Sequence, residues 1–132
     1  RSKLFKGCVP PKDISLVSRQ QTPTDACDVF EGFFDFLSAA TLGVANGNDA
    51  LVLNSVGNLA KSFPYLDGYA KINCWLDNDG AGRKTFEALR ARYKEKVIDC
   101  SGVYAGSKDL NEHLQKKLQE KTTNNKTLKF KL

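Results

Sequence analysis

The 132-residue sequence contains no methionine, one histidine and one tryptophan, and it has no long run of hydrophobic residues. Its apolar stretches fall far short of the roughly 20 residues that a membrane-spanning helix requires, which excludes such a helix. Residues 1–12 are basic and contain Pro10 and Pro11, so they lack the pattern of a secretory signal peptide. Because the chain begins with arginine and has no methionine, we expect it to be a fragment of a larger protein.

Cysteine is sparse, and its spacing excludes the common zinc fingers. Cys8, Cys27, Cys74 and Cys100 form no close pair along the sequence. Three of them fall in or beside predicted strands, where a free cysteine behaves as a small hydrophobic residue. This pattern favours a reducing cytoplasm over secretion. The single histidine, His113, lies within a predicted helix without a partner motif, so we interpret it as a surface or packing residue.

The net charge of +5 is distributed unevenly along the chain. When lysine and arginine are counted against aspartate and glutamate, residues 1–25 carry +3, residues 26–113 carry −3 and residues 114–132 carry +5. An acidic middle suits a cation site, whereas basic ends suit a polyanionic partner such as nucleic acid. The alternative is that the basic residues only keep the two ends of the chain solvated.

Short apolar segments alternate with segments of helical spacing, and this alternation predicts an α/β domain. Because a helical segment follows each strand, we expect a roughly four-stranded parallel sheet with helices on both faces. The expected strands are 26–30, 50–56, 71–76 and 96–100, with a short additional one at 14–17. The expected helices are 33–42, 58–63, 83–94 and a last one that Ser107 caps.

The domain is expected to span residues 24–121, with a basic lead-in or the end of an upstream module at 1–23 and a basic tail at 122–132. The helix 33–42 is apolar nearly all round, so we expect it to be buried against the sheet. Gly43 fits the position that ends this helix. Pro64 is expected to end the helix 58–63, because the residue before a proline disfavours the helical conformation.

The most informative stretch is Lys71–Lys84, in which an apolar segment leads into Asp77 and Asp79. Along an extended strand the two carboxylates would point the same way, with Cα atoms roughly 6–7 Å apart. Two like charges at this distance repel unless a cation lies between them. Oxygen ligands without a nearby histidine or cysteine suit Mg²⁺. Gly80 and Gly82 would then allow a sharp turn into the next helix.

Three further acidic residues are expected at the same edge, because the carboxyl ends of parallel strands lie together. Glu31 follows the first strand of the predicted domain, Asp35 lies one helical turn after it, and Asp109 begins the last helix. Asp35 and Asp109 each have a simpler alternative. Asp35 would serve equally as a solvated residue on the outer face of its helix, and Asp109 as a favourable charge at a helix N-terminus. The Asp77–Asp79 pair would serve equally as solvated acids at a turn.

A calcium-binding EF-hand is excluded by the same stretch. Counted from Asp77, Ala81 and Ala88 occupy the positions of the third oxygen ligand and the final glutamate of such a loop. Neither alanine has a side-chain oxygen. A phosphatase of the haloacid dehalogenase type has a superficially similar stretch, but those families usually carry threonine or valine where Ala81 stands.

Taken together, the motifs resemble the Toprim domain of bacterial-type primases, type IA and type II topoisomerases and some nucleases. That family has a glutamate after its first strand and an Asp-x-Asp motif after its third. The corresponding residues here lie in Val29–Asp35 and Trp75–Gly82, and Gly106–Leu110 is similar to a later Lys-Asp segment. The resemblance covers roughly residues 24–118. It is closest to primase-like proteins of bacterial mobile elements, in which a zinc-binding module often precedes the domain; this chain contains no such module.

The resemblance implies a Rossmann-like Toprim fold and metal-assisted phosphoryl transfer on DNA or RNA, with nucleotides as substrates and Mg²⁺ or Mn²⁺ as cofactor. It implies that Glu31, Asp77 and Asp79 are catalytic and bind the metal, with Asp35 and Asp109 as supporting ligands. Glu31 would complete the metal shell or exchange a proton with a 3′-hydroxyl group.

Three basic residues are candidates for contacts with phosphate. Arg83 and Lys84 follow the glycines at the start of a predicted helix, and Lys108 precedes the last one. For Arg83 the alternative is an ordinary ion pair with Glu87 one turn later.

Our leading hypothesis is therefore the Toprim catalytic module of a bacterial DNA primase-like nucleotidyltransferase that acts in plasmid or transposon mobilisation or replication. Such a module need not be active as an isolated fragment, since upstream domains would be missing. The alternatives are a Toprim nuclease, topoisomerase-like strand cleavage and a non-catalytic nucleic-acid-binding module. A topoisomerase would need a nucleophilic tyrosine in another domain, and none of the four tyrosines here has a supporting motif.

Overall fold

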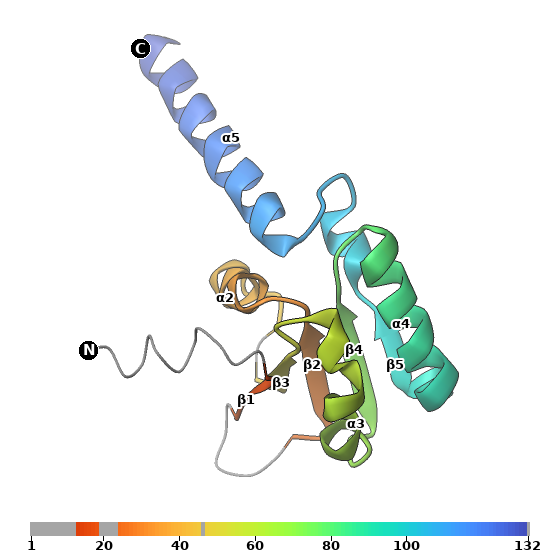
Figure 1. Ribbon diagram of the computed structural model, residues 1–132. Helices are drawn as coiled ribbons and strands as arrows, with labels where there is room; N and C mark the ends of the chain where they lie inside the picture. The colour runs from red at the N-terminus through yellow and green to blue at the C-terminus, as the bar shows by residue number, and fades with distance from the viewer. Residues whose placement is uncertain (1–12, 19–23, 46, 132) are drawn as a thin grey trace, which may run out of the picture.

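Figure 1 shows the computed structural model of the chain, which describes residues 13–18, 24–45 and 47–131, with side chains up to residue 123. Five strands form one sheet in the order β1-β3-β2-β4-β5. They are β1 (Ser15–Val17), β2 (Ala26–Phe30), β3 (Asp49–Val52), β4 (Lys71–Trp75) and β5 (Val97–Asp99). Four of them are parallel, and β1 pairs antiparallel with β3. The predicted α/β fold is confirmed, with this antiparallel edge strand added to the four parallel ones.

Helices cover both faces of the sheet, as predicted. The helices are α2 (Phe33–Leu42), α3 (Leu59–Leu66), α4 (Gly80–Tyr93) and α5 (Leu110–Lys131). Helices α3 and α4 lie on one face, while α2 and the start of α5 lie on the other (Figure 1). Short 3₁₀ turns occupy Val56–Asn58, Lys94–Lys96 and Ser101–Tyr104.

The two hydrophobic cores follow from the alternation of side chains along each strand. Val29 of β2 and Leu51 of β3 face α3 and α4, where they join Leu89. Phe30 and its register partners on β3 and β4 point the other way, toward Phe36 of α2. Because both faces are buried, β2 reads as a nearly continuous apolar run, which is typical of a central parallel strand.

The boundary around the Asp pair differs from the prediction. Strand β4 ends at Trp75, so the alternation of strand side chains does not extend to Asp77 and Asp79. Helix α4 begins at Gly80, three residues earlier than predicted, and Asp79 is its N-cap. The capping hydrogen bond, from the N–H of Gly82 to Oδ1 of Asp79 at 2.8 Å, explains the earlier start.

Helix α2 has the predicted bounds and ends at Gly43, whose φ of 74° is the left-handed conformation expected of a C-cap glycine. The helix packs against the sheet as predicted, but with one side only. Phe34 is 72% exposed and Phe33 is 45% exposed, whereas Phe36 and Ala39 face the core. Only one side of the helix contacts the sheet and α5, so the apolar residues of the other side remain at the surface.

Two further predictions of helix ends are wrong. Helix α3 continues through Pro64 to Leu66. The proline removes one backbone hydrogen bond, but Leu66 is fully buried and holds the last turn against the core. Helix α5 is capped by Asp109, whose Oδ1 accepts the N–H of Glu112 at 2.8 Å, and not by Ser107. The expected strand 50–56 ends at Val52, four residues earlier.

Helix α5 runs away from the body of the domain and continues to Lys131, so most of the predicted basic tail at 122–132 is helical. Within the described part of the chain, no helix is long and apolar enough to cross a membrane. Cys27, Cys74 and Cys100 are free thiols, and the first two are buried as expected. Cys8 and the rest of residues 1–12 of the predicted lead-in lie outside the described residues, as do 19–23.

Candidate metal centre

The site is built where β2 and β4 end side by side. Phe30 and Trp75 are register partners in the parallel pair, so Glu31 and the residues after Leu76 leave the sheet together. The backbone N–H of Asp77 donates a hydrogen bond of 3.1 Å to Oε1 of Glu31. Strand β2 has β3 as its neighbour on one side and β4 on the other, so the chain changes direction across the sheet at β2. In open α/β sheets, ligands bind at such a change of direction, outside the carboxyl ends of the strands.

Two helix N-termini supply the remaining carboxylates of the centre. Asp35 lies in the first turn of α2 and is only 6% exposed, and its Oδ1 accepts the N–H of Asn111 at 3.2 Å. Asp109 caps α5. Oxygen atoms from Asp35, Asp77 and Asp109 all lie within 4.8 Å of one another. The alternative of a solvated Asp35 on the outer face of α2 is therefore wrong.

Glu31 and Asp79 flank this group of three. Glu31 contacts Asp77 as described above, and Asp79 uses one carboxylate oxygen to cap α4. The other oxygen of Asp79 lies 3.9 Å from Nζ of Lys108. Both carboxylates also lie near enough to raise the pKa of Asp77. All five predicted acids thus meet at one edge of the sheet, while the division of labour among them stays a prediction.

The centre fits a divalent cation by its own chemistry. Oδ1 of Asp77 is buried and, within the described part of the chain, accepts no hydrogen bond. A buried carboxylate oxygen without a partner is costly unless a cation satisfies it. The three grouped residues offer only oxygen ligands, which suits Mg²⁺ or Mn²⁺ rather than zinc.

Burial and mutual repulsion raise the pKa values of these carboxyls. Burial, followed by the charge of Glu31, raises the pKa of Asp77 to about 7. Burial, followed by the charge of Asp109, raises the pKa of Asp35 to about 6. Burial also raises the pKa of Glu31, although the hydrogen bond from the backbone of Asp77 opposes the rise. Without a cation, the cluster therefore holds protons close to neutral pH.

This pKa pattern predicts an unusual dependence of stability on pH. In the absence of divalent ions, the folded protein keeps protons on Asp77 and Asp35 that the unfolded chain releases near pH 4. Their contribution to the free energy of unfolding is therefore fully present below about pH 4 and is lost as the pH rises through 6 to 7. Urea unfolding in EDTA at pH 4.5, 6.0 and 7.5 measures the free energy of unfolding. This free energy should decrease less with pH in Asp77→Asn than in the wild type. If the free energy of unfolding of the wild type instead rose relative to that of Asp77→Asn between pH 4.5 and 7.5, the assignment would be contradicted.

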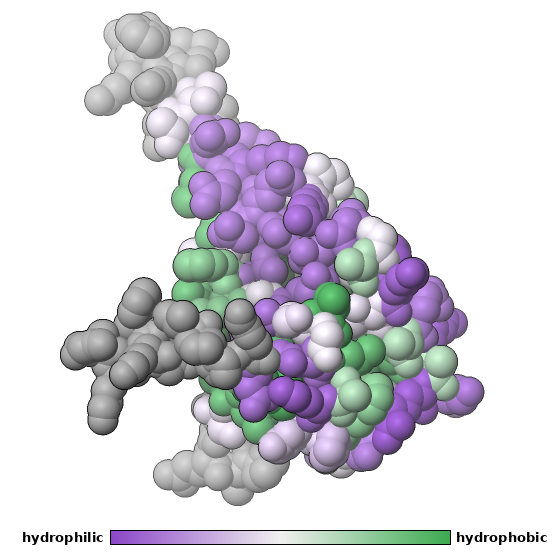
Figure 2. All heavy atoms as spheres, viewed as in Figure 1, coloured by the Kyte–Doolittle hydropathy of each residue, from purple (hydrophilic) through white to green (hydrophobic). Residues whose placement is uncertain are grey.

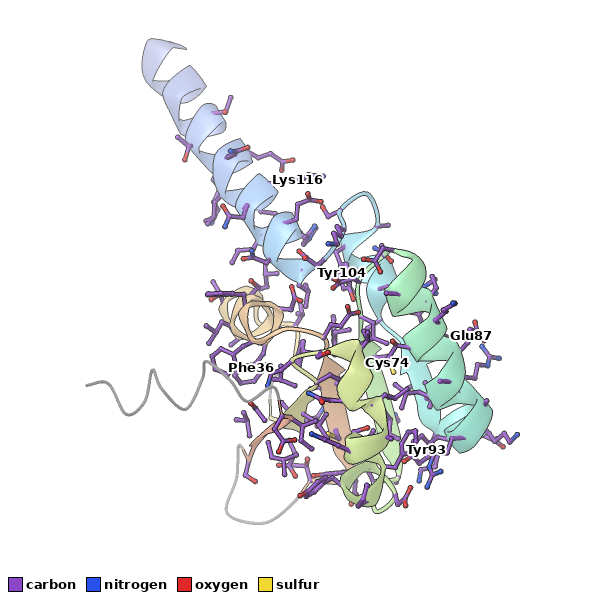
Figure 3. The ribbon with its side chains drawn as sticks, in the orientation of Figure 1. Phe36, Cys74, Glu87, Tyr93, Tyr104 and Lys116 are labelled. Carbon is purple, nitrogen blue, oxygen red and sulfur yellow. The ribbon has the colours of Figure 1, made fainter. Side chains whose placement is uncertain are left out.

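Several residues that sequence reasoning missed hold the carboxylates in place. The side-chain amide of Asn78 donates to the backbone carbonyls of Tyr104 and Ser107. The hydroxyl of Tyr104 donates to the carbonyl of Leu76 at 2.6 Å, directly before Asp77. Figure 3 shows Tyr104 where the segment before α5 meets the end of β4. These contacts join residues about 28 positions apart in the sequence, so no local sequence pattern could predict them.

Aromatic rings support the same strand ends from below. Trp75 stacks between Phe30 and Tyr104, with ring centroids 6.1 and 6.5 Å away, respectively. Phe36 of α2 meets Phe30 edge to face at 5.7 Å. The rings form one connected group under the carboxylates, and such pairs add stability beyond the area they bury.

The three basic candidates lie in different settings. Arg83 makes an ion pair of 3.1 Å with Asp99 and does not form the alternative pair with Glu87, which points away from α4 into solvent (Figure 3). Lys84 is exposed on α4. Lys108 lies beside Asp79, at the rim of the carboxylate cluster. Of the three, Lys108 is therefore best placed to meet an anion held at the cluster.

Comparisons with known proteins agree with this geometry. In the search of solved structures, the primase fragment of the bacteriophage T7 primase-helicase protein matches with a TM-score of 0.56 and 25% identity. The match covers 68% of this chain but only 38% of that fragment. The search of curated proteins found no match. Residues 28–114, about two thirds of the chain, match the Toprim-like family, and the chain belongs to that family.

Proposed function

We propose that this Toprim-like domain is the catalytic module of a primase-like enzyme and performs Mg²⁺-dependent nucleotidyl transfer on nucleic acid. The observation that carries the proposal is the meeting of five carboxylates at the edge where β2 and β4 end, with the unpartnered Oδ1 of Asp77 among them. The similarity to a phage primase fragment supports primer synthesis over the other activities of the family.

The residues would divide the work by position. Asp77, Asp35 and Asp109 would hold a divalent ion, with Asp79 facing the rim. The bound ion would neutralise charge on the phosphates that react. Burial raises the pKa of Glu31, and this favours the proton exchange with a 3′-hydroxyl group that its proposed role requires.

The basic residues would bind the phosphates of the substrate. Lys108 lies beside Asp79 and can contact a phosphate without leaving the cluster. Lys84 is exposed on α4 and would contact a phosphate of the nucleic-acid strand farther from the carboxylate cluster. Arg83 would contribute less directly, because its guanidinium is already paired with Asp99 and lies 5.2 Å from the ring of Phe86.

The finer parts of the proposal concern the whole protein. The chain spans about two fifths of the T7 fragment that it matches, so template-directed priming would depend on other domains, among them a zinc-binding module. A role in plasmid or transposon mobilisation has the support of the Val29–Asp35 motif alone. The free thiols of Cys27 and Cys74 fit a reducing compartment, and we propose the cytoplasm.

The test is a set of parallel assays with Mg²⁺, Mn²⁺ or EDTA. Metal-dependent extension on a single-stranded template with nucleotides present would support the primase-like function. Metal-dependent cutting of single-stranded or supercoiled DNA without nucleotides would replace it with a nuclease. Binding of nucleic acid that neither EDTA nor loss of the Asp77 carboxylate alters would indicate a module without turnover. Because the isolated chain can lack the domains needed for extension, metal binding is measured alongside by thermal shift.

A further inference from the structure

The first turn of α2 exposes two adjacent aromatic rings. Phe33 is 45% exposed and Phe34 is 72% exposed, and Leu37 extends the same outer side of the helix. Hydrophobic atoms gather at this place and continue along the adjoining side of α5 (Figure 2). Exposed apolar clusters of this kind generally mark a binding surface.

The position of the two rings relates them to the carboxylate cluster. They directly precede Asp35 in the first turn of α2, and these three residues span about 3 Å along the helix axis. Asp35 points inward to the cluster, while Phe34 points outward. The rings therefore leave α2 from the same turn as Asp35, whose carboxylate belongs to the cluster.

The ring of Phe33 also packs against the other aromatic rings of the domain. Its centroid lies 5.6 Å from that of Phe36, which in turn meets Phe30 in the core. A fixed ring loses little side-chain entropy when a ligand covers it, so this surface is ready to accept a flat partner.

The charge beside the rings indicates the chemistry of that partner. Helix α5 carries six lysines and two glutamates and contacts α2, where Oγ of Ser38 donates to Oδ1 of Asn111 at 3.3 Å. Lys117 and Lys121 are exposed on α5, whereas Lys116 pairs with Glu112 at 3.8 Å and donates to the carbonyl of Gly106 at 2.8 Å. Aromatic rings next to a basic track are what unpaired nucleic acid requires, because its bases stack on the rings while its phosphates contact the cations.

Resting on the proposed function, we propose that Phe33 and Phe34 form a stacking platform for the bases of single-stranded nucleic acid beside the metal centre. The lysines of α5 bind the phosphates of the same strand. Duplex nucleic acid cannot use the platform, because its bases are already stacked on one another. The platform thus selects unpaired template or primer nucleotides.

The test measures the affinity of the full chain for a fluorescent single-stranded oligonucleotide by anisotropy, in EDTA and at low salt. Phe34→Ala and Phe34→Leu should both weaken binding about 5- to 150-fold, whereas Phe34→Tyr should stay within about twofold of the wild type. Leu37→Ala is the matched control, since it removes exposed apolar surface without a ring. An abasic oligonucleotide should bind the wild type and Phe34→Leu equally.

The leucine variant separates a base from a protein partner, because leucine keeps the apolar surface but has no π face. Wild-type affinity in Phe34→Leu, or a loss in Leu37→Ala as large as in Phe34→Ala, would overturn the platform and indicate a protein-docking surface. Failure of the catalytic proposal is recognised separately. Loss of affinity in Phe34→Leu together with no metal-dependent turnover would leave the platform standing and remove the catalytic proposal. Turnover with unchanged affinity in Phe34→Leu would do the reverse.

Discussion

Asp77→Asn is expected to abolish the stabilisation by Mg²⁺ and to lower metal-dependent activity about 100- to 1,000-fold or more, the scale on which loss of one key electrostatic group acts. Asparagine keeps the size of the side chain but removes the negative charge nearest the centre of the cluster. Its amide would also place a donor where a cation needs an oxygen ligand. Thermal unfolding with increasing Mg²⁺, together with the nucleotidyl-transfer and cleavage assays, measures both effects.

The same substitution should make the metal-free protein more stable at pH 7.5, which separates loss of function from loss of fold. Repulsion and burial raise the pKa of Asp77 to about 7, so its charged form is unfavourable in the folded protein. Removing that charge should add about 1–2 kcal/mol to the free energy of unfolding, once solvent screening of the half-buried carboxyl is allowed for. Asp25→Asn, an exposed aspartate before β2, is the control and should change neither property. A variant that keeps the Mg²⁺-dependent rise in Tm would rule out Asp77 as a ligand.

Gly82→Ala is expected to cost about 3 kcal/mol or more of stability and to displace Asp77. A Cβ atom at residue 82 would overlap the carbonyl oxygen of Asp77 and lie 2.8 Å from its carbonyl carbon. These are backbone atoms of the segment that carries the carboxylate, so they cannot move aside as a flexible side chain would. Either α4 shifts from its cap or Asp77 shifts from the cluster. Urea unfolding measures the first effect and Mg²⁺ affinity the second.

Gly80→Ala provides a matched control two residues away on the same helix. A Cβ at residue 80 meets nothing within 4 Å. Alanine also favours the helical conformation over glycine by up to about 1 kcal/mol, so this variant should be neutral or slightly stabilising. If Gly80→Ala and Gly82→Ala cost the same, the close approach of α4 to Asp77 would not be the reason for glycine at residue 82.

The structure brings the five predicted acids to one edge of the sheet, partly for reasons other than those of the sequence argument. Glu31 and Asp77 were expected to meet because parallel strands share a carboxyl edge, and the hydrogen bond between them bears this out. The strand argument for the relative direction of Asp77 and Asp79 is wrong, because β4 ends at Trp75. Asp79 instead owes its orientation to its role as the cap of α4. The sequence does not show whether an aspartate at this position continues the strand or caps the next helix. The hydrogen bond from the N–H of Gly82 identifies Asp79 as the cap.

Helix α2 illustrates the limit of composition as a guide to burial. Because its residues are apolar nearly all round, the helix was predicted to be buried against the sheet, yet Phe34 is 72% exposed. Hydrophobicity indicates that a side chain favours burial, whereas the packing of neighbouring elements decides whether that side chain is buried. Here the sheet and α5 cover one side only, and the exposed side became the basis for the proposed stacking platform.

The sequence by itself determined the α/β class, the bounds of α2 and the edge of the sheet at which the five acidic residues lie, because these follow from periodicity along a short stretch and from the rule that parallel strands end together. Only the tertiary structure decided that oxygen atoms of Asp35, Asp77 and Asp109 lie within 4.8 Å of one another, and that Tyr104 and Asn78 hold the end of β4 in place. The physical reason is range. Local conformation depends on residues a few positions apart, whereas the distances within the site depend on how segments tens of residues apart pack together.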